Sequence, residues 1–170
     1  MKIIKLTSFC VLLVFLSSCS IEPVEATFDF FEGTYRLTEY TVDVPVDLDN
    51  DSNYNTNLLE EIDCESNESL VFDIQGFVYS NLTFHPKIEV FLVDALLGEF
   101  AVDVECDTEG VIGMASSYRK NGNTIIINER MATIKGNNIT MIFENAIKIY
   151  NQDKTVVIDT KDLRLVYTKD

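Results

Sequence analysis

The stretch Lys135-Gly136-Asn137-Asn138-Ile139-Thr140-Met141-Ile142-Phe143-Glu144 joins a tight turn to a strand, and it decides the class of fold. Asparagine and glycine tolerate the positive φ that tight hairpin turns require, so residues 135–138 predict a turn. Ile139, Met141 and Phe143 then alternate with the residues between them, which is typical of a strand with one buried face. The stretch predicts a β-hairpin that covers a core.

The same pattern continues on both sides of this stretch. A second turn, Lys120-Asn121-Gly122-Asn123, precedes the apolar run 124–127. Period-two alternation also marks residues 70–75, 100–107 and 163–167. Turn residues recur about every ten positions, which predicts about eight to ten antiparallel strands. The one helix expected is short, near residues 56–62.

Many sequential strands joined by short turns predict an all-β domain. We favour an antiparallel up-and-down barrel, because closure removes the exposed strand edges that promote aggregation. A β-sandwich is the alternative. The chain has 170 residues, 46% of them hydrophobic, and no internal repeat, which fits one domain with a buried core.

The chain is strongly acidic. It has 28 Asp and Glu against 13 Lys and Arg, a formal net charge of −15. Such a charge argues against nucleic acids and anionic membrane surfaces as partners.

The first residues have the order of a secretory signal. Lys2 and Lys5 precede the apolar run 6–16, which is too short to span a bilayer as a helix. Leu16-Ser17-Ser18-Cys19 has the form of a bacterial lipobox. We therefore expect residues 1–18 to be a signal peptide and Cys19 to be lipidated; an ordinary signal peptide that happens to contain a cysteine is the alternative.

Lipidation at Cys19 predicts a protein held at a membrane only through its N-terminal lipid. Residues 19–29 contain a proline and no clear period, so they are expected to be a tether, and residues 30–170 the domain. Ser20 follows Cys19, where aspartate is the common inner-membrane retention residue of enteric bacteria. We expect a cell-envelope protein, at the outer membrane, on either its periplasmic face or the cell surface.

Two cysteines remain for the domain, since Cys10 leaves with the signal peptide. Cys64 and Cys106 predict a disulfide, because an even pair in an exported chain usually forms one. Two buried thiols, or half of a metal site, are the alternatives. His85 is the only histidine, so the chain has too few cysteine and histidine ligands for a typical zinc site with four protein ligands.

The order of features resembles that of the lipocalin-like lipoproteins of Bacteroidota. The lipobox is followed by residues 33–37 (Gly-Thr-Tyr-Arg-Leu), an acidic loop at 47–51, residues 57–60 (Asn-Leu-Leu-Glu) and Cys64. The resemblance covers most of residues 30–168 and is motif-like over 47–76. It implies a lipocalin-type barrel that can hold an apolar cavity, with no enzymatic activity.

The acidic loop has oxygen-bearing side chains at every second position. Calcium takes six to eight oxygen ligands, and alternate acids on a curved loop can converge on it. Ser52 and Leu58 stand where an EF-hand has glycine and glutamate, and Glu60 or Glu61 could replace the missing carboxylate. The alternative is a solvated acidic loop. The candidate ligands of a structural calcium ion are Asp47, Asp49, Asp51, Asn53 and Glu60.

Aromatic residues are dense in the central strands. They could line a ligand cavity of the kind that eight-stranded barrels hold, or fill a packed interior. The candidate cavity residues are Phe72, Phe77, Tyr79, Phe84, Phe91 and Phe100.

No recognisable motif accompanies His85, which Pro86 follows, so we expect a turn residue and no catalytic residues. Two functions follow. The first is a lipid-tethered module that binds a small apolar ligand. The second is a structural or interaction lipoprotein with a packed core, whose acidic loops contact another envelope protein.

Overall fold

The structure, a computed structural model, describes residues 31–64, 67–81, 86–96, 99–106 and 113–170. The predicted signal peptide and the predicted tether both lie outside these residues. The strands are β1 (Gly33–Val46), β2 (Asn55–Asn57), β3 (Ser69–Phe72), β4 (Phe77–Ser80), β5 (Lys87–Asp94), β6 (Glu99–Glu105), β7 (Met114–Asn121), β8 (Thr124–Ile127), β9 (Arg130–Lys135), β10 (Asn138–Tyr150) and β11 (Val157–Lys169).

Eight of the strands close into an antiparallel barrel, which confirms the predicted fold class. The hydrogen-bonded order is β1-β3-β4-β7-β8-β9-β10-β11, and β11 pairs again with β1. Barrel neighbours follow one another along the chain, apart from strands inserted between them, as in an up-and-down barrel. Closure leaves no free edge among these eight strands and excludes the sandwich.

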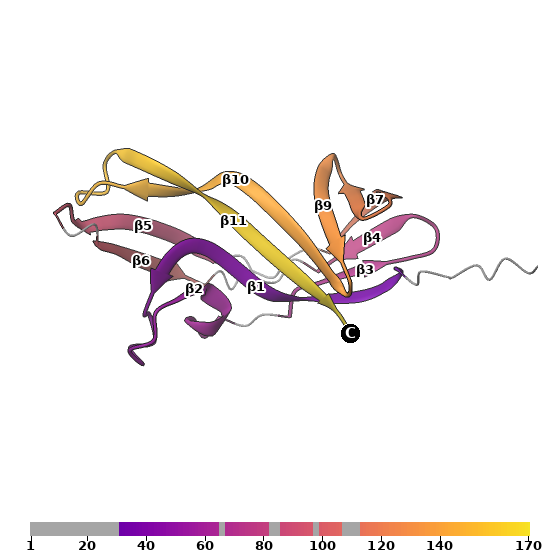
Figure 1. The fold of residues 1–170 in the computed structure, drawn as a ribbon, viewed down its shortest axis with the longest axis horizontal. Helices are drawn as coiled ribbons and strands as arrows, with labels where there is room; N and C mark the ends of the chain where they lie inside the picture. The colour runs from indigo at the N-terminus through magenta and orange to yellow at the C-terminus, as the bar shows by residue number, and fades with distance from the viewer. Residues whose placement is uncertain (1–30, 65–66, 82–85, 97–98, 107–112) are drawn as a thin grey trace, which may run out of the picture.

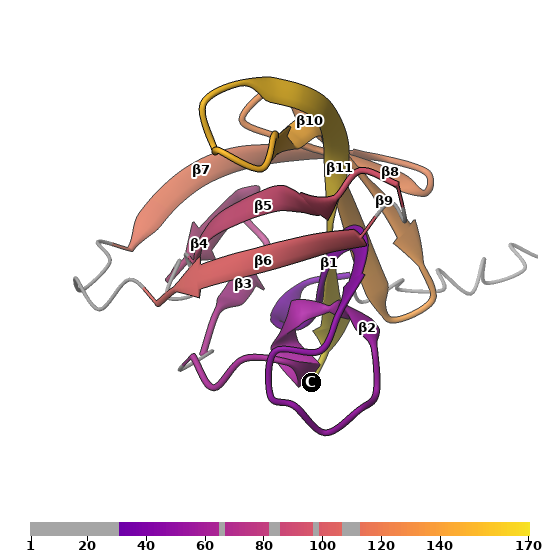
Figure 2. The same ribbon diagram turned by 90° about the vertical axis from the view of Figure 1, so that its left-hand side faces the viewer.

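The remaining strands extend the barrel at one end. β5 and β6 form a hairpin that joins β10, with β5 parallel to it through Val90 and Ile149. Figures 1 and 2 show this hairpin beside the long ends of β10 and β11. β2 pairs with β1 and leads into η1 (Leu58–Glu60), a single 3₁₀ turn where a short helix was expected. Among the described residues, no helix has the length and apolar character needed to span a membrane.

A β-bulge lets one strand serve both parts of the molecule. Along β1, the buried positions are Tyr35 and Leu37, and then Tyr40 and Val42, so the phase changes by one residue. The pairing with β11 is irregular at the same place, between Leu37 and Glu39. An extra residue reverses the face that each side chain occupies. Both halves of β1 therefore turn their apolar side chains inward.

The turns that the sequence predicted form as expected. Gly122 and Gly136 adopt φ of 57° and 60° between paired strands. The strand predicted at residues 70–75 is shorter, because β3 ends at Phe72 and Gly76 adopts φ of 88° in the following turn. Ile74, which continues the alternation in sequence, is therefore 81% exposed.

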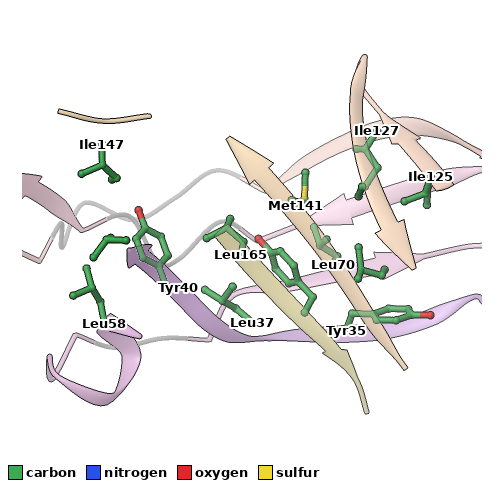
Figure 3. Close-up of a cluster of buried hydrophobic side chains, with 14 of the residues drawn as sticks. Tyr35, Leu37, Tyr40, Leu58, Leu70, Ile125, Ile127, Met141, Ile147 and Leu165 are labelled. Carbon is green, nitrogen blue, oxygen red and sulfur yellow. The ribbon is translucent and has the colours of Figure 1, made fainter. Parts of the chain in front are cut away.

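The core has one part inside the barrel and one under the extension. In Figure 3, Tyr35 and Ile125 lie on one side of Tyr40, and Leu58 and Ile147 lie on the other. Val42, Leu58, Ile125, Val90 and Ile149 are fully buried. The extension therefore has a core of its own, continuous with that of the barrel.

Candidate functional site

Aromatic side chains fill one end of the barrel, the end that carries the turns at Gly76, Gly122 and Gly136. We call it the closed end. The Phe72 ring lies 4.7 Å from that of Phe31 and 5.1 Å from that of Tyr118, between ring centroids. Tyr35 packs edge-on against Phe72 at 5.5 Å. Such tilted and edge-on pairs are the favoured packing of aromatic rings, and they leave this end solid.

A cavity of about 400 Å³ occupies the opposite half of the barrel, which we call the open end. The volume lies within the roughly 300–1,000 Å³ of ligand pockets, and most of the wall is apolar. Each of the eight barrel strands contributes at least one lining residue. Figure 3 labels five of the lining residues: Tyr40, Leu70, Ile127, Met141 and Leu165. The others are Glu68, Val78, Ser80, Met114, Ser116, Asn128, Arg130, Phe143, Leu163 and Tyr167.

One buried acid provides a polar spot in this apolar wall. Glu68 is only 4% exposed, and the Tyr167 hydroxyl donates a hydrogen bond to its Oε1. Burial, and then the neighbouring Glu68, raise the pKa of Tyr40 to about 12. The same two causes raise the pKa of Tyr167. Both hydroxyls therefore stay protonated at neutral pH, and the proton of Tyr167 is the one donated to Glu68 in the cavity wall.

A positively charged side chain, that of Arg130, lies where the cavity opens to the surface. Arg130 follows the turn at Asn128 and Glu129, whose φ values of 48° and 69° fit a tight hairpin turn. Its guanidinium lies 4.7 Å from the ring centroid of Phe143, a cation–π contact. Among the described residues Arg130 forms no ion pair. The open end therefore offers a positive group beside an apolar cavity.

The aromatic residues that the sequence analysis proposed as cavity residues do not line the cavity where they are described. Phe72 packs in the closed end, and Phe84 lies outside the described residues. Phe77 and Tyr79 are each 46% exposed on the outer face of β4, where Val78 between them points inward. None of the five described aromatic residues lines the cavity.

Two of these aromatic residues belong to strands outside the barrel. Phe91 lies on β5 with Lys154 Nζ 4.0 Å from its ring centroid, and Phe100 on β6 is 39% exposed. Aromatic density therefore did not identify the lining. The inward alternation of Met141 and Phe143, and of Leu163, Leu165 and Tyr167, was the signal in the sequence that could have found part of it.

The acidic loop brings together a different set of carboxylates from the predicted one. Asp47 and Asp49 each place an oxygen within 4.8 Å of an oxygen of Glu61, and the three also lie within that distance of one another. Glu60 instead accepts hydrogen bonds from the side chains of Asn55 and Asn57.

The other two predicted ligands bond to each other. Asp51 accepts from the backbone and the side chain of Asn53, each at 2.7 Å. These bonds, led by the one from the Asn53 side chain, lower the pKa of Asp51.

The predicted disulfide is present. Cys64 and Cys106 are joined, with their Cα atoms 5.6 Å apart, within the range usual for disulfides. The bond links the segment after η1 to the end of β6. This pairing excludes the two free thiols and the half metal site.

Cys19 and His85 lie outside the described residues.

In comparisons with models of protein families, with curated proteins and with solved structures, the chain matches none of them. What the structure supports of the resemblance is the closed eight-stranded antiparallel barrel.

Proposed function

We propose that the protein is a lipocalin-like lipoprotein of the cell envelope whose barrel binds a small apolar ligand, without enzymatic activity. The observation that carries the proposal is the cavity of about 400 Å³ at the open end. Its walls are largely aliphatic and aromatic, and burying an apolar molecule there gains about 25 cal/mol per Å² removed from water. The few polar groups can fix the ligand's orientation, as in other ligand pockets.

Native mass spectrometry of the purified protein tests the proposal. We expect a species heavier than the processed polypeptide, whose extra mass is lost on denaturation. A protein that carries no small molecule, and that also fails to bind the apolar fluorophore 1-aminoanthracene, would contradict the proposal.

A pair of neighbouring serines offers a matched test of the cavity as the binding site. Ser116 lines the cavity, whereas the next residue on β7, Ser117, is exposed on the outer face. Ser116→Phe is expected to fill the cavity and reduce fluorophore affinity at least about tenfold, the effect of roughly 1.4 kcal/mol. Ser117→Phe adds the same side chain outside and should leave the affinity unchanged. Equal affinity in the two variants would place the ligand elsewhere.

A second candidate function, the binding of another envelope protein, has one observation in its favour. Exposed apolar residues gather at the tips of the β5–β6 and β10–β11 hairpins, which lie side by side (Figure 1). Leu96 is 96% exposed, Val156 56% and Ile158 49%. Exposed apolar groups of this kind often mark interaction sites. A protein without ligand or fluorophore binding would favour this function over the first.

The proposed lipid anchor has its own test, with two cysteines as a matched pair. Cys19→Ala is expected to move the protein from the membrane fraction to the soluble fraction, because the acyl chains supply the membrane affinity. Cys10→Ala changes a residue of the proposed signal peptide and should leave the protein in the membrane fraction. Retention of the Cys19→Ala variant at the membrane would argue against lipidation at this residue.

A further inference from the structure

Three carboxylates from two segments meet beside the extension of the barrel. Asp47 and Asp49 follow β1, and Glu61 follows η1. One oxygen of each lies within 4.8 Å of the others. We call these three residues the acidic pocket.

Glu61 and one oxygen of Asp47 are withdrawn from water. Glu61 is 6% exposed, and its Oε2 accepts a hydrogen bond from the Leu48 amide at 2.9 Å. Asp47 Oδ2 accepts from the Ser52 amide at 3.2 Å. Asp47 Oδ1 is buried and has no hydrogen-bond partner. A buried acceptor without a partner is uncommon in folded proteins and is costly, more so when it carries charge.

The acidic pocket also lacks a balancing positive charge. Among the described residues, no lysine or arginine forms an ion pair with Asp47, Asp49 or Glu61. Like charges at this separation repel, and the repulsion grows as water is excluded. A bound cation would remove the repulsion and give Asp47 Oδ1 the partner it lacks.

We propose that the acidic pocket is a calcium site, with Asp47, Asp49 and Glu61 as its protein ligands. Calcium prefers oxygen ligands at 2.3–2.6 Å, so two oxygens on the same ion can lie up to about 4.6–5.2 Å apart. The separations in the acidic pocket agree with that limit. Three carboxylates leave coordination positions for water, which calcium accepts.

Calcium bound there would join the loop after β1 to the segment after η1, three residues before Cys64. Its role is therefore to hold this corner of the extension together. The site is separate from the barrel cavity, since none of its three residues lines that cavity. The proposal is thus independent of ligand binding.

Thermal unfolding of the purified full-length protein tests the site. After chelation and removal of divalent ions, CaCl₂ at about 100 times the dissociation constant is expected to raise Tm by roughly 5–10 °C, since the ion binds only the folded chain. Calorimetric titration should give one ion per chain.

Neighbouring acids supply the matched controls. Glu61→Gln should abolish the calcium-dependent rise in Tm, and Glu60→Gln, which alters an acid outside the acidic pocket, should keep it. Asp49→Asn serves as a second variant, because Asp49 is exposed and its replacement does not disturb the core; the rise should shrink or vanish there too. No rise in the unaltered protein, or a full rise in both Glu61→Gln and Asp49→Asn, would overturn the proposal.

Discussion

Replacing Cys64 and Cys106 together by alanine is expected to lower the free energy of unfolding by about 4 kcal/mol. The two residues are 42 positions apart, and the bond between them removes conformational freedom from the unfolded chain. Cys64 is only half-buried and Cys106 is exposed, so little packing is lost with the sulfur atoms. Urea unfolding, followed by circular dichroism, measures the difference.

Reduction of the unaltered protein provides the control for this prediction. With reductant present, its unfolding midpoint should fall close to that of the double variant, while the midpoint of the variant should not change. Equal free energies of unfolding for the oxidised protein and the double variant would contradict the prediction that the bond stabilises the fold by restricting the unfolded chain.

Phe72→Ala is expected to cost about 3–5 kcal/mol, the range for removing a buried phenylalanine ring. Phe72 is 2% exposed and forms the centre of the aromatic cluster that fills the closed end. Its loss leaves a cavity bordered by Phe31 and Tyr118, in a part of the barrel that closure prevents from collapsing. The same urea titration measures the effect.

Phe77→Ala is the matched control, because Phe77 is the same residue type on the next strand but is 46% exposed. We expect a cost below about 1 kcal/mol, as for most changes at the surface. A cost for Phe77→Ala as large as that for Phe72→Ala would contradict the placement of the two rings on opposite faces of the barrel wall.

The two residues also show how far sequence reasoning reaches. Alternation correctly indicated that Leu70 and Phe72 share a face. Aromatic character alone then grouped Phe72 with Phe77 as cavity residues, although they lie on opposite faces of the barrel. The alternation along one strand shows which side chains share a face of that strand. Only the pairing of β3 with β4 in the closed barrel shows which of the two faces points into the barrel.

The acidic loop shows a similar division. Its sequence indicated a cluster of oxygen ligands, and Asp47 and Asp49 do lie together. The choice between Glu60 and Glu61 depends on the orientation of the 3₁₀ turn. Asn57 caps that turn, and Asn55 and Asn57 hold Glu60 by hydrogen bonds, which leaves Glu61 to face the loop.

The count of cysteines was enough to predict the disulfide, although its two ends are 42 positions apart. Residues close together in the chain were enough to predict the all-β class and the tight turns at Gly122 and Gly136. These follow from local backbone preferences and from the alternation of side chains along a strand. Tertiary structure alone decided the bulge in β1, the placing of the β5–β6 hairpin outside the barrel, and the set of residues around the cavity. Those features depend on contacts between strands far apart in the chain, because a barrel closes only when every strand has found its register.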